Sequence, residues 1–183
     1  MNLARATPQK IKEASRLIIK GALVAFPTET VYGLGADALN SVAVARIFEV
    51  KKRPHFDPLI VHIADVSRLK DLANHIPKIA YALIEKFWPG PLTLVLKKKK
   101  IVPDLVTSGL DTVAVRMPNH PVALKLIRAS KTPIAAPSAN PFSYLSPTRA
   151  KHVVEQLGDK VDMILDGGLC AVGVESTVLY ISG

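Results

Sequence analysis

Short apolar runs alternate with stretches of helical periodicity along almost the whole chain, and this alternation restricts the fold more than any other feature. The apolar runs, each typical of a strand, span residues 22–26, 58–63, 92–96, 112–117, 134–136, 161–165 and 174–181. Between them, apolar residues recur at helical spacing in residues 8–20, 41–50, 67–73, 77–87, 121–129 and 146–157. Strands that alternate with helices predict the α/β class.

The boundaries between these segments carry cap and turn residues. Thr7 and Pro8 predict the start of a helix, and Gly21 predicts its end. Residues 27–35, with the sequence PTETVYGLG, are rich in hydroxyl groups and glycine and predict a loop. No linker, repeat or shift in composition indicates a second domain, so we predict one domain across residues 1–183.

Composition and cysteine content predict an ordered protein of a reducing compartment. Apolar residues make up 49% of the chain and charged residues 21%, which is typical of a globular domain. Cys170 is the single cysteine, so no internal disulfide can form. Residues 1–20 mix charges with apolar residues, unlike a signal peptide, and every apolar run is far shorter than the roughly 18 residues of a membrane span. We therefore expect a cytoplasmic protein with no membrane partner.

The chain carries a net charge of +9, from 24 Lys and Arg against 15 Asp and Glu. This excess predicts attraction to anions such as nucleotides, RNA, DNA or an acidic surface, and charge alone does not choose among them. The four lysines at 97–100 are typical of solvated residues after a strand, with nucleic-acid contact as the alternative.

Several familiar active-site motifs are absent from the sequence. It contains no Gly-x4-Gly-Lys-Ser/Thr phosphate loop, and Gly33 and Gly35 lack the third glycine of a dinucleotide-binding turn. It has no Gly-x-Ser-x-Gly motif, and its five histidines are scattered, so we predict no metal site built from protein ligands. These absences leave enzymes that act by positioning and charge neutralisation, or a simple binding protein.

Two polar segments on separate predicted elements could meet around a polyanion. Lys51 and Arg53 stand at the end of a predicted helix, and an arginine can grip two phosphate oxygens, although cations also stabilise a helix C-terminus. Ser138 and Asn140 follow the strand at 134–136 and offer short hydrogen-bonding side chains. Cations together with small polar groups suit a nucleotide triphosphate.

Four further side chains have both a binding and a structural interpretation. Thr30 lies in a loop that could bind a ligand or simply satisfy its own amides. His62, on an apolar strand, fits a buried core histidine or a ligand contact. Arg116, at the end of a strand, needs a carboxylate or a ligand anion as partner. Asp57 could hold magnesium, bind a ribose hydroxyl or form a turn.

Seven segments, in this order, resemble the YrdC-type threonylcarbamoyl-adenylate synthases. They are PTETVYGLG (27–35), KKRP (51–54), PLIVH (58–62), WPGPLT (88–93), TVAVRMP (112–118), APSAN (136–140) and VGVESTV (172–178). The Lys-x-Arg and Ser-x-Asn signature is weak alone, but seven ordered matches span nearly the whole chain. The resemblance implies an open, twisted, mixed sheet with flanking helices and a concave basic face.

The resemblance also implies a reaction. L-threonine, bicarbonate or carbon dioxide, and ATP would give threonylcarbamoyl-AMP and pyrophosphate, which is a nucleotidyl transfer. The product serves the threonylcarbamoyl-adenosine modification of tRNA, so tRNA and the tRNA threonylcarbamoyl-transferase machinery are the implied macromolecular partners. Mg²⁺ bound with ATP is the implied cofactor.

By the same resemblance, eleven residues form the site. Those implied for L-threonine are Thr30, His62, Arg116, Ala136 and Ser176. Those implied for ATP or its magnesium are Lys51, Arg53, Asp57, Thr112, Ser138 and Asn140. Lys51 and Arg53 are the implied catalytic residues, because they would take the charge of the leaving pyrophosphate.

The chain departs from the family pattern at two points. Asp57 stands where the family usually has Asn, which adds a negative charge to a nucleotide contact. Longer members continue beyond the Glu-Ser-Thr strand into a further strand and a second domain, which would make residues 1–183 a catalytic domain truncated before these parts. Two alternative functions stay open: a non-catalytic RNA- or DNA-binding domain, and a carbamoyl-transfer domain of the same fold.

Overall fold

The computed structural model, which describes residues 3–181, contains a nine-stranded sheet of order β1-β8-β2-β3-β7-β4-β6-β5-β9. The strands are β1 (Leu3–Arg5), β2 (Val24–Pro27), β3 (Tyr32–Asp37), β4 (Ile60–His62), β5 (Leu92–Lys97), β6 (Thr112–Arg116), β7 (Ile134–Ala135), β8 (Met163–Asp166) and β9 (Thr177–Tyr180). Four neighbouring pairs are parallel and four are antiparallel. The predicted α/β class with an open, mixed sheet is confirmed.

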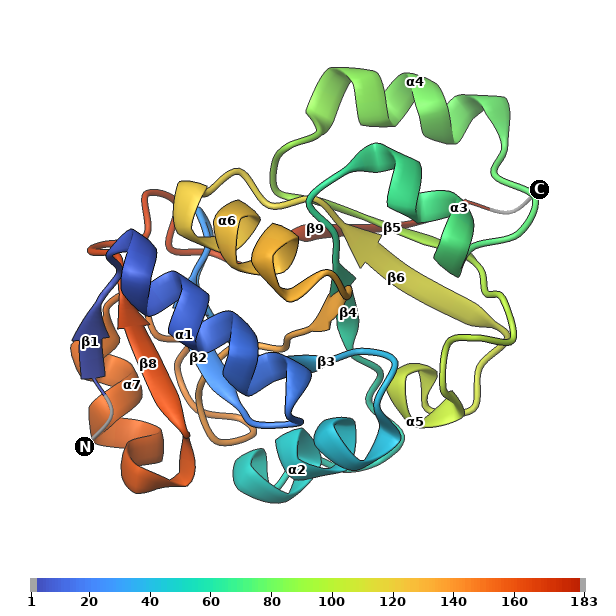
Figure 1. Cartoon of the computed structure of the whole chain (residues 1–183). Helices are drawn as coiled ribbons and strands as arrows, with labels where there is room; N and C mark the ends of the chain where they lie inside the picture. Colours follow the sequence, from blue (N-terminus) through green and yellow to red (C-terminus); the bar gives the residue numbers. More distant parts are fainter. Residues whose placement is uncertain (1–2, 182–183) are drawn as a thin grey trace.

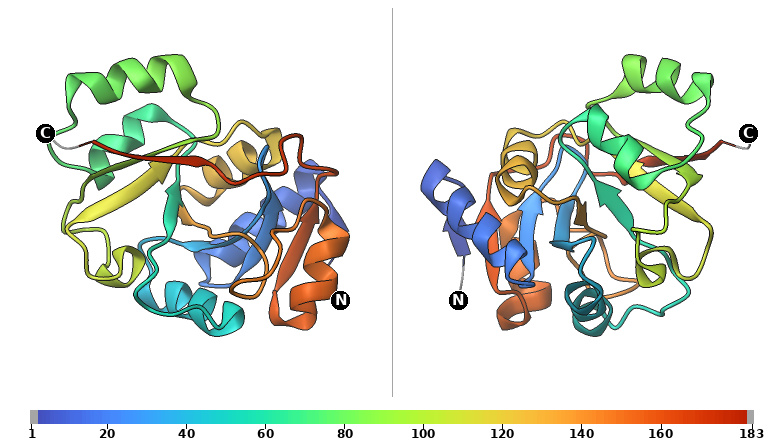
Figure 2. Two further views of the ribbon diagram at one scale, coloured as in Figure 1. Left: turned by 180° about the vertical axis from the view of Figure 1, so that it is seen from behind. Right: turned by 45° about the vertical axis from the view of Figure 1, so that its right-hand side comes forward.

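Helices flank this sheet (Figure 1). They are α1 (Pro8–Ile19), α2 (Ser41–Lys51), α3 (Leu69–Leu72), α4 (Lys78–Phe87), α5 (Asp104–Thr107), α6 (Pro121–Ser130) and α7 (Ala150–Leu157), with 3-10 turns at Val66–Arg68 and Gly158–Lys160. Helices α1 and α6 pack against each other in front of the sheet. Seen from behind, β9 lies in front and these two helices lie at the back (Figure 2).

Alternating side chains divide the interior into two apolar clusters. On β2, Val24 and Phe26 join the cluster that also contains the buried faces of α1 and α6. Ala25, between them, points into the larger cluster with residues of α2, α3 and α4. A strand buried on both faces reads as a continuous apolar run, which is why residues 22–26 are recognisable in the sequence.

The first helix forms as its capping residues predict. The Thr7 hydroxyl accepts a hydrogen bond from the Lys10 amide at 3.3 Å, and Pro8 occupies the first turn, where its missing N–H costs nothing. Ile11, Ala14 and Ile18 are buried on one side of α1. Gly21 follows with a φ of +82°, the left-handed conformation that favours glycine at a helix end.

The structure differs from the expected elements in three places. Residues 32–35, predicted as loop, belong to β3, because Tyr32 and Leu34 are buried and the segment pairs with β2. The last helix starts at Ala150 and not at Ser146, since the Pro147 carbonyl accepts a hydrogen bond from the Tyr32 amide and so belongs to an extended segment. Strand β1 and helix α5 span only three and four residues, too few for a periodic pattern.

In residues 3–181, none of the helices has the length and apolar character required to cross a membrane.

One face of the central strands carries polar residues and thereby prepares the site. On β6, Val113 and Val115 point into the larger apolar cluster, so Thr112, Ala114 and Arg116 face the other side. In register with Arg116 lie His62 on β4 and Thr93 on β5. Because neighbouring strands are about 4.8 Å apart, these three side chains form one row on one face.

Gly35 is required by close packing between β2, β3 and β7. A methyl group at this position would lie 2.6 Å from the Phe26 ring and 2.8 Å from an Ile134 methyl group. We therefore expect Gly35→Ala to lower the free energy of unfolding by about 2 kcal/mol or more, measured by urea denaturation.

Gly109→Ala is the control, because its new methyl group meets no atom within 4 Å and only the φ of +80° is strained. That strain should cost about 1 kcal/mol. A loss of stability in Gly35→Ala no greater than in the control would contradict tight packing at this point of the sheet.

Candidate active site

A cavity of about 390 Å³ opens over the polar face of β4, β6 and β5. This volume lies within the range of small-molecule sites. Nine of the eleven residues predicted for the site line it, namely Thr30, Arg53, Asp57, His62, Thr112, Arg116, Ala136, Ser138 and Ser176. The structure therefore brings together residues that are up to 146 positions apart in the sequence, from Thr30 to Ser176.

The turn at 28–31 combines the two interpretations that the sequence left open. The Thr28 hydroxyl accepts hydrogen bonds from the amides of Thr30 and Val31, both at 3.2 Å, and donates to the Val31 carbonyl at 2.7 Å. Thr28 thus satisfies the turn itself. The Thr30 hydroxyl lies 2.8 Å from that of Thr28 and also lines the cavity.

Arg116 forms a buried ion pair with Glu29. Its Nη2 lies 2.6 Å from Glu29 Oε1, a close ionic contact without the alignment of a hydrogen bond. The guanidinium also donates to the Thr30 hydroxyl at 3.1 Å and to the Gly90 carbonyl at 3.2 Å. The sequence predicts either a carboxylate or a ligand anion beside Arg116, and Glu29 supplies the carboxylate. Because Arg116 also lines the cavity, it still presents positive charge to a ligand.

His62 is both a buried residue and a cavity residue. Burial lowers the pKa of His62 to about 3, and the nearby Arg116 charge acts in the same direction. The imidazole is therefore neutral at pH 7, able to donate one hydrogen bond and to accept one. Its ring stands edge-on to Phe26, with 6.4 Å between centroids, and among the described residues its Nδ1 has no hydrogen-bond partner.

Arg53 is folded onto the turn that follows α2. Its Nη2 lies 2.8 Å from Asp57 Oδ2, while its Nε and Nη2 donate to the carbonyls of Asp57 and Pro58, each at 3.0 Å. The guanidinium carbon also lies 5.9 Å from the centroid of the Phe142 ring. Asp57 thus acts as a turn carboxylate that fixes the Arg53 side chain at the edge of the cavity.

Lys51 and Asn140 are the two predicted residues that do not line the cavity. The buried Lys51 ammonium group donates to the carbonyls of Ser138 and Asn140. The Asn140 amide donates to the carbonyls of Pro141 and Tyr144 at 2.9 and 2.8 Å. Both side chains therefore hold the loop that carries Ser138. Burial lowers the pKa of Lys51 to about 7, with the neighbouring Arg53 charge as the next cause.

Glu175 lines the cavity, although no role was predicted for it from the sequence. Its carboxylate accepts a hydrogen bond from the Ser146 hydroxyl at 2.8 Å. The segment just before it crosses the 28–31 turn, where the Val172 and Gly173 amides donate to the carbonyls of Glu29 and Thr30 at 2.9 and 3.0 Å. The one sequence signal for Glu175 was its position next to Ser176, because hydrogen bonds between distant segments cannot be read from a linear pattern.

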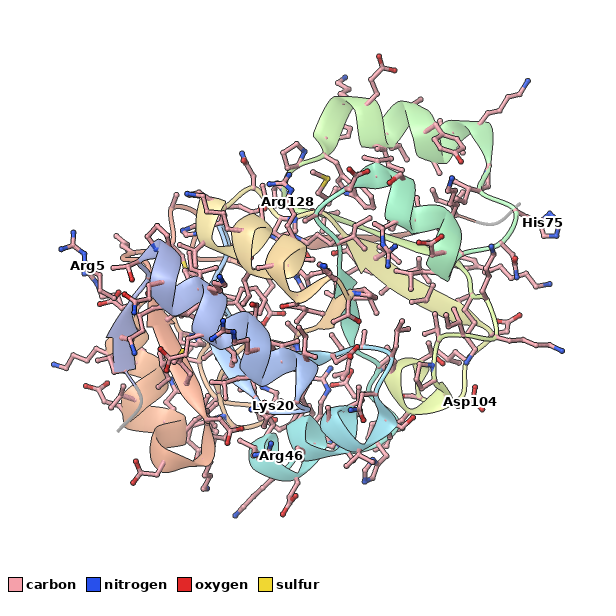
Figure 3. The ribbon with its side chains drawn as sticks, in the orientation of Figure 1. Arg5, Lys20, Arg46, His75, Asp104 and Arg128 are labelled. Atoms are coloured by element: carbon pink, nitrogen blue, oxygen red, sulfur yellow. The ribbon has the colours of Figure 1, made fainter. Side chains whose placement is uncertain are left out.

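The charges that line the cavity are balanced, with Arg53 and Arg116 against Asp57 and Glu175. Other cations lie on the outer surface of the molecule, among them Arg5, Lys20 and Arg128 (Figure 3). Within residues 3–181, no group of three or more His, Cys, Asp or Glu side chains could hold a metal ion by itself. One or two carboxylates do suit Mg²⁺ that is held mainly by phosphate oxygens, and Asp57 and Glu175 meet that requirement.

Comparison with known proteins identifies the family to which the chain belongs. The model of the Sua5/YciO/YrdC family, described as "Telomere recombination", matches residues 16–183. The threonylcarbamoyl-AMP synthase of Pyrococcus abyssi is 59% identical over 170 residues, which are 93% of this chain and 50% of that protein. The enzyme of the same name from Bacillus subtilis is 54% identical over 178 residues, or 97% of this chain and 51% of that protein.

A solved structure shares the fold closely. The crystal structure of P. abyssi Sua5 complexed with L-threonine gives a TM-score of 0.95 at 56% identity, covering 98% of this chain and 53% of that one. This chain spans about half the length of the curated relatives named above. Since the family model covers nearly all of the sequence and the fold agrees over the same length, the chain belongs to the Sua5/YciO/YrdC family.

Proposed function

We propose that this chain makes threonylcarbamoyl-AMP and pyrophosphate from L-threonine, bicarbonate or carbon dioxide, and ATP, and so acts as a nucleotidyltransferase. The observation that carries the proposal is that one cavity brings together nine of the residues expected for the two substrates. The threonylcarbamoyl-AMP synthases to which the chain is similar support the reaction. The threonine complex of P. abyssi Sua5 supports an amino acid as one substrate.

The length of β6 separates an amino-acid region from a nucleotide region. Arg116 and Thr112 stand at opposite ends of this strand, four residues or about 13 Å apart. Around Arg116 lie His62, in register, and the Thr30 hydroxyl. These groups suit the carboxylate and amine of a small amino acid. Thr112 points toward the end of the cavity where we place the nucleotide.

The reaction needs positioning and charge stabilisation rather than a protein nucleophile. The threonine amine either adds to carbon dioxide with loss of a proton or displaces water from bicarbonate, and both routes give a carbamate. A carbamate oxygen then attacks the α-phosphorus, so that pyrophosphate leaves. Arg53, fixed by Asp57 at the cavity edge, would stabilise the charge on the leaving pyrophosphate. Lys51 would act on the same charge through the loop that it holds, because its ammonium group bonds the Ser138 carbonyl.

Mg²⁺ is the proposed cofactor, bound with ATP. When bound, it would neutralise part of the triphosphate charge, with Asp57 and Glu175 as the lining carboxylates. The product would pass in the cytoplasm to the machinery that modifies tRNA. The lining charges of the cavity are balanced, so the cavity itself offers no excess positive charge to tRNA.

The decisive assay is release of pyrophosphate from ATP that requires both L-threonine and bicarbonate. The proposed synthase shows this joint requirement. A nucleic-acid-binding domain releases no pyrophosphate, and a carbamoyl-transfer domain with another carbamate source shows no need for bicarbonate together with threonine. Either of those results would remove the proposal.

Arg116 should affect threonine more than ATP. Because Arg116→Gln alone leaves the Glu29 charge buried and unpaired, the variant is made together with Glu29→Gln. We expect the KM for threonine to rise about 20- to 100-fold, as for loss of a charge-assisted hydrogen bond, and the KM for ATP to stay within about twofold. Equal effects on both constants would exclude Arg116 as the carboxylate partner.

Lys51 should also make the free energy of unfolding depend on pH. Its folded-state pKa of about 7 lies below the value near 10.4 of an unfolded lysine, so between these values the unfolded chain binds a proton that the folded protein has released. Stability should therefore rise with pH from about 7 to 10, by up to about 1.4 kcal/mol per pH unit, relative to Lys51→Met. Urea denaturation of both proteins across this range measures the difference, and parallel curves would contradict a neutral buried amine.

A further inference from the structure

Thr93 is a fully buried hydroxyl residue in strand β5, whose other residues are apolar except for the terminal Lys97. Leu92, Leu94 and Leu96 on this strand belong to the larger apolar cluster. Thr93 lies on the opposite face, which is the face of the cavity, because Val95 two residues later lines the cavity. Thr93 itself does not line it, since another side chain covers the hydroxyl.

The covering group is Ser176. The two hydroxyl oxygens are 2.8 Å apart, and within residues 3–181 this is the one side-chain hydrogen bond of Thr93. A buried hydroxyl without a partner is costly, and a valine of the same shape would avoid that cost. A threonine at this position is therefore best explained by its bond to Ser176.

Ser176 is a partly buried residue whose hydroxyl is not itself oriented by the pairing of β9 with β5. It precedes β9, an edge strand whose residues Thr177–Tyr180 are all exposed, and a serine hydroxyl can take three rotamers. Thr93 is β-branched and therefore stiff in a strand, and it is fixed by register opposite Arg116. The conformationally restricted hydroxyl of Thr93 on β5 thus meets the serine hydroxyl that lines the cavity.

We propose that Thr93 is a positioning residue that orients the Ser176 hydroxyl toward a substrate in the amino-acid region. This inference rests on the proposed function. For an anionic or carbonyl oxygen of the substrate, Ser176 must donate into the cavity, and Thr93 must then be the donor to Ser176. Hydrogen bonds in such a chain polarise and strengthen one another.

The test compares Thr93→Val with Thr93→Ser in the 183-residue chain. Valine keeps the shape and removes the hydroxyl, whereas serine keeps the hydroxyl. We expect Thr93→Val to raise the KM for threonine about five- to tenfold, in line with the loss of one hydrogen bond, and to leave the KM for ATP within about twofold. Thr93→Ser should restore the threonine KM to within about twofold of the wild type.

Thr132→Val is the matched control. The Thr132 hydroxyl bonds the Asp37 carboxylate at 2.6 Å, and the residue does not line the cavity, so this variant should change neither KM. An unchanged threonine KM in Thr93→Val, an equal rise in both KM values, or failure of Thr93→Ser to restore would overturn the proposal.

Titration calorimetry with L-threonine alone separates this inference from the proposed function. If the wild type released no pyrophosphate but bound threonine, a five- to tenfold weaker binding by Thr93→Val would uphold the positioning role although the proposed reaction had failed. Equal affinities would overturn the positioning role. A wild type that bound no threonine would overturn both.

Discussion

The buried contact between Arg116 and Glu29 joins parts of the chain on which the whole cavity depends. Arg116 ends β6 and also bonds Thr30 and the Gly90 carbonyl, so strand, turn and loop meet at one guanidinium. The backbone of the same turn accepts hydrogen bonds from the amides of Val172 and Gly173. Removing either charge would leave the other buried without a partner, which costs about 3–5 kcal/mol. The stability of the cavity wall therefore depends on this ion pair.

Much of the architecture could be predicted because it follows from local patterns. The apolar runs and helical periods gave the α/β class, and Thr7 and Gly21 gave the ends of α1. The order of the strands could not be read in this way, since it depends on which apolar faces fit together. The strand at Tyr32 and Leu34 also could not be predicted from local pattern. The glycines around them predict a loop, but burial and pairing with β2 favour a strand.

The family resemblance named most of the predicted residues that line the cavity, but it named few of the contacts that hold them in place. Resemblance placed nine of eleven residues around one cavity, but it treated Lys51 and Asn140 as ligand contacts. In the structure both hold the loop that carries Ser138. Glu29 and Thr93 were missed as partners, because a buried residue that acts on another side chain has no signal of its own in the sequence.

The balanced charges of the cavity change how an anionic nucleotide would arrive. Two arginines facing two carboxylates produce little field at a distance, whereas the net charge of +9 is spread over outer residues such as Arg5, Lys20 and Arg128. Long-range attraction would then come from the surface, and short-range recognition from the cavity. Added salt screens the first within about 10 Å at 0.1 M but acts weakly on the second. Ionic strength should consequently slow diffusional capture of the nucleotide far more than it shortens its residence.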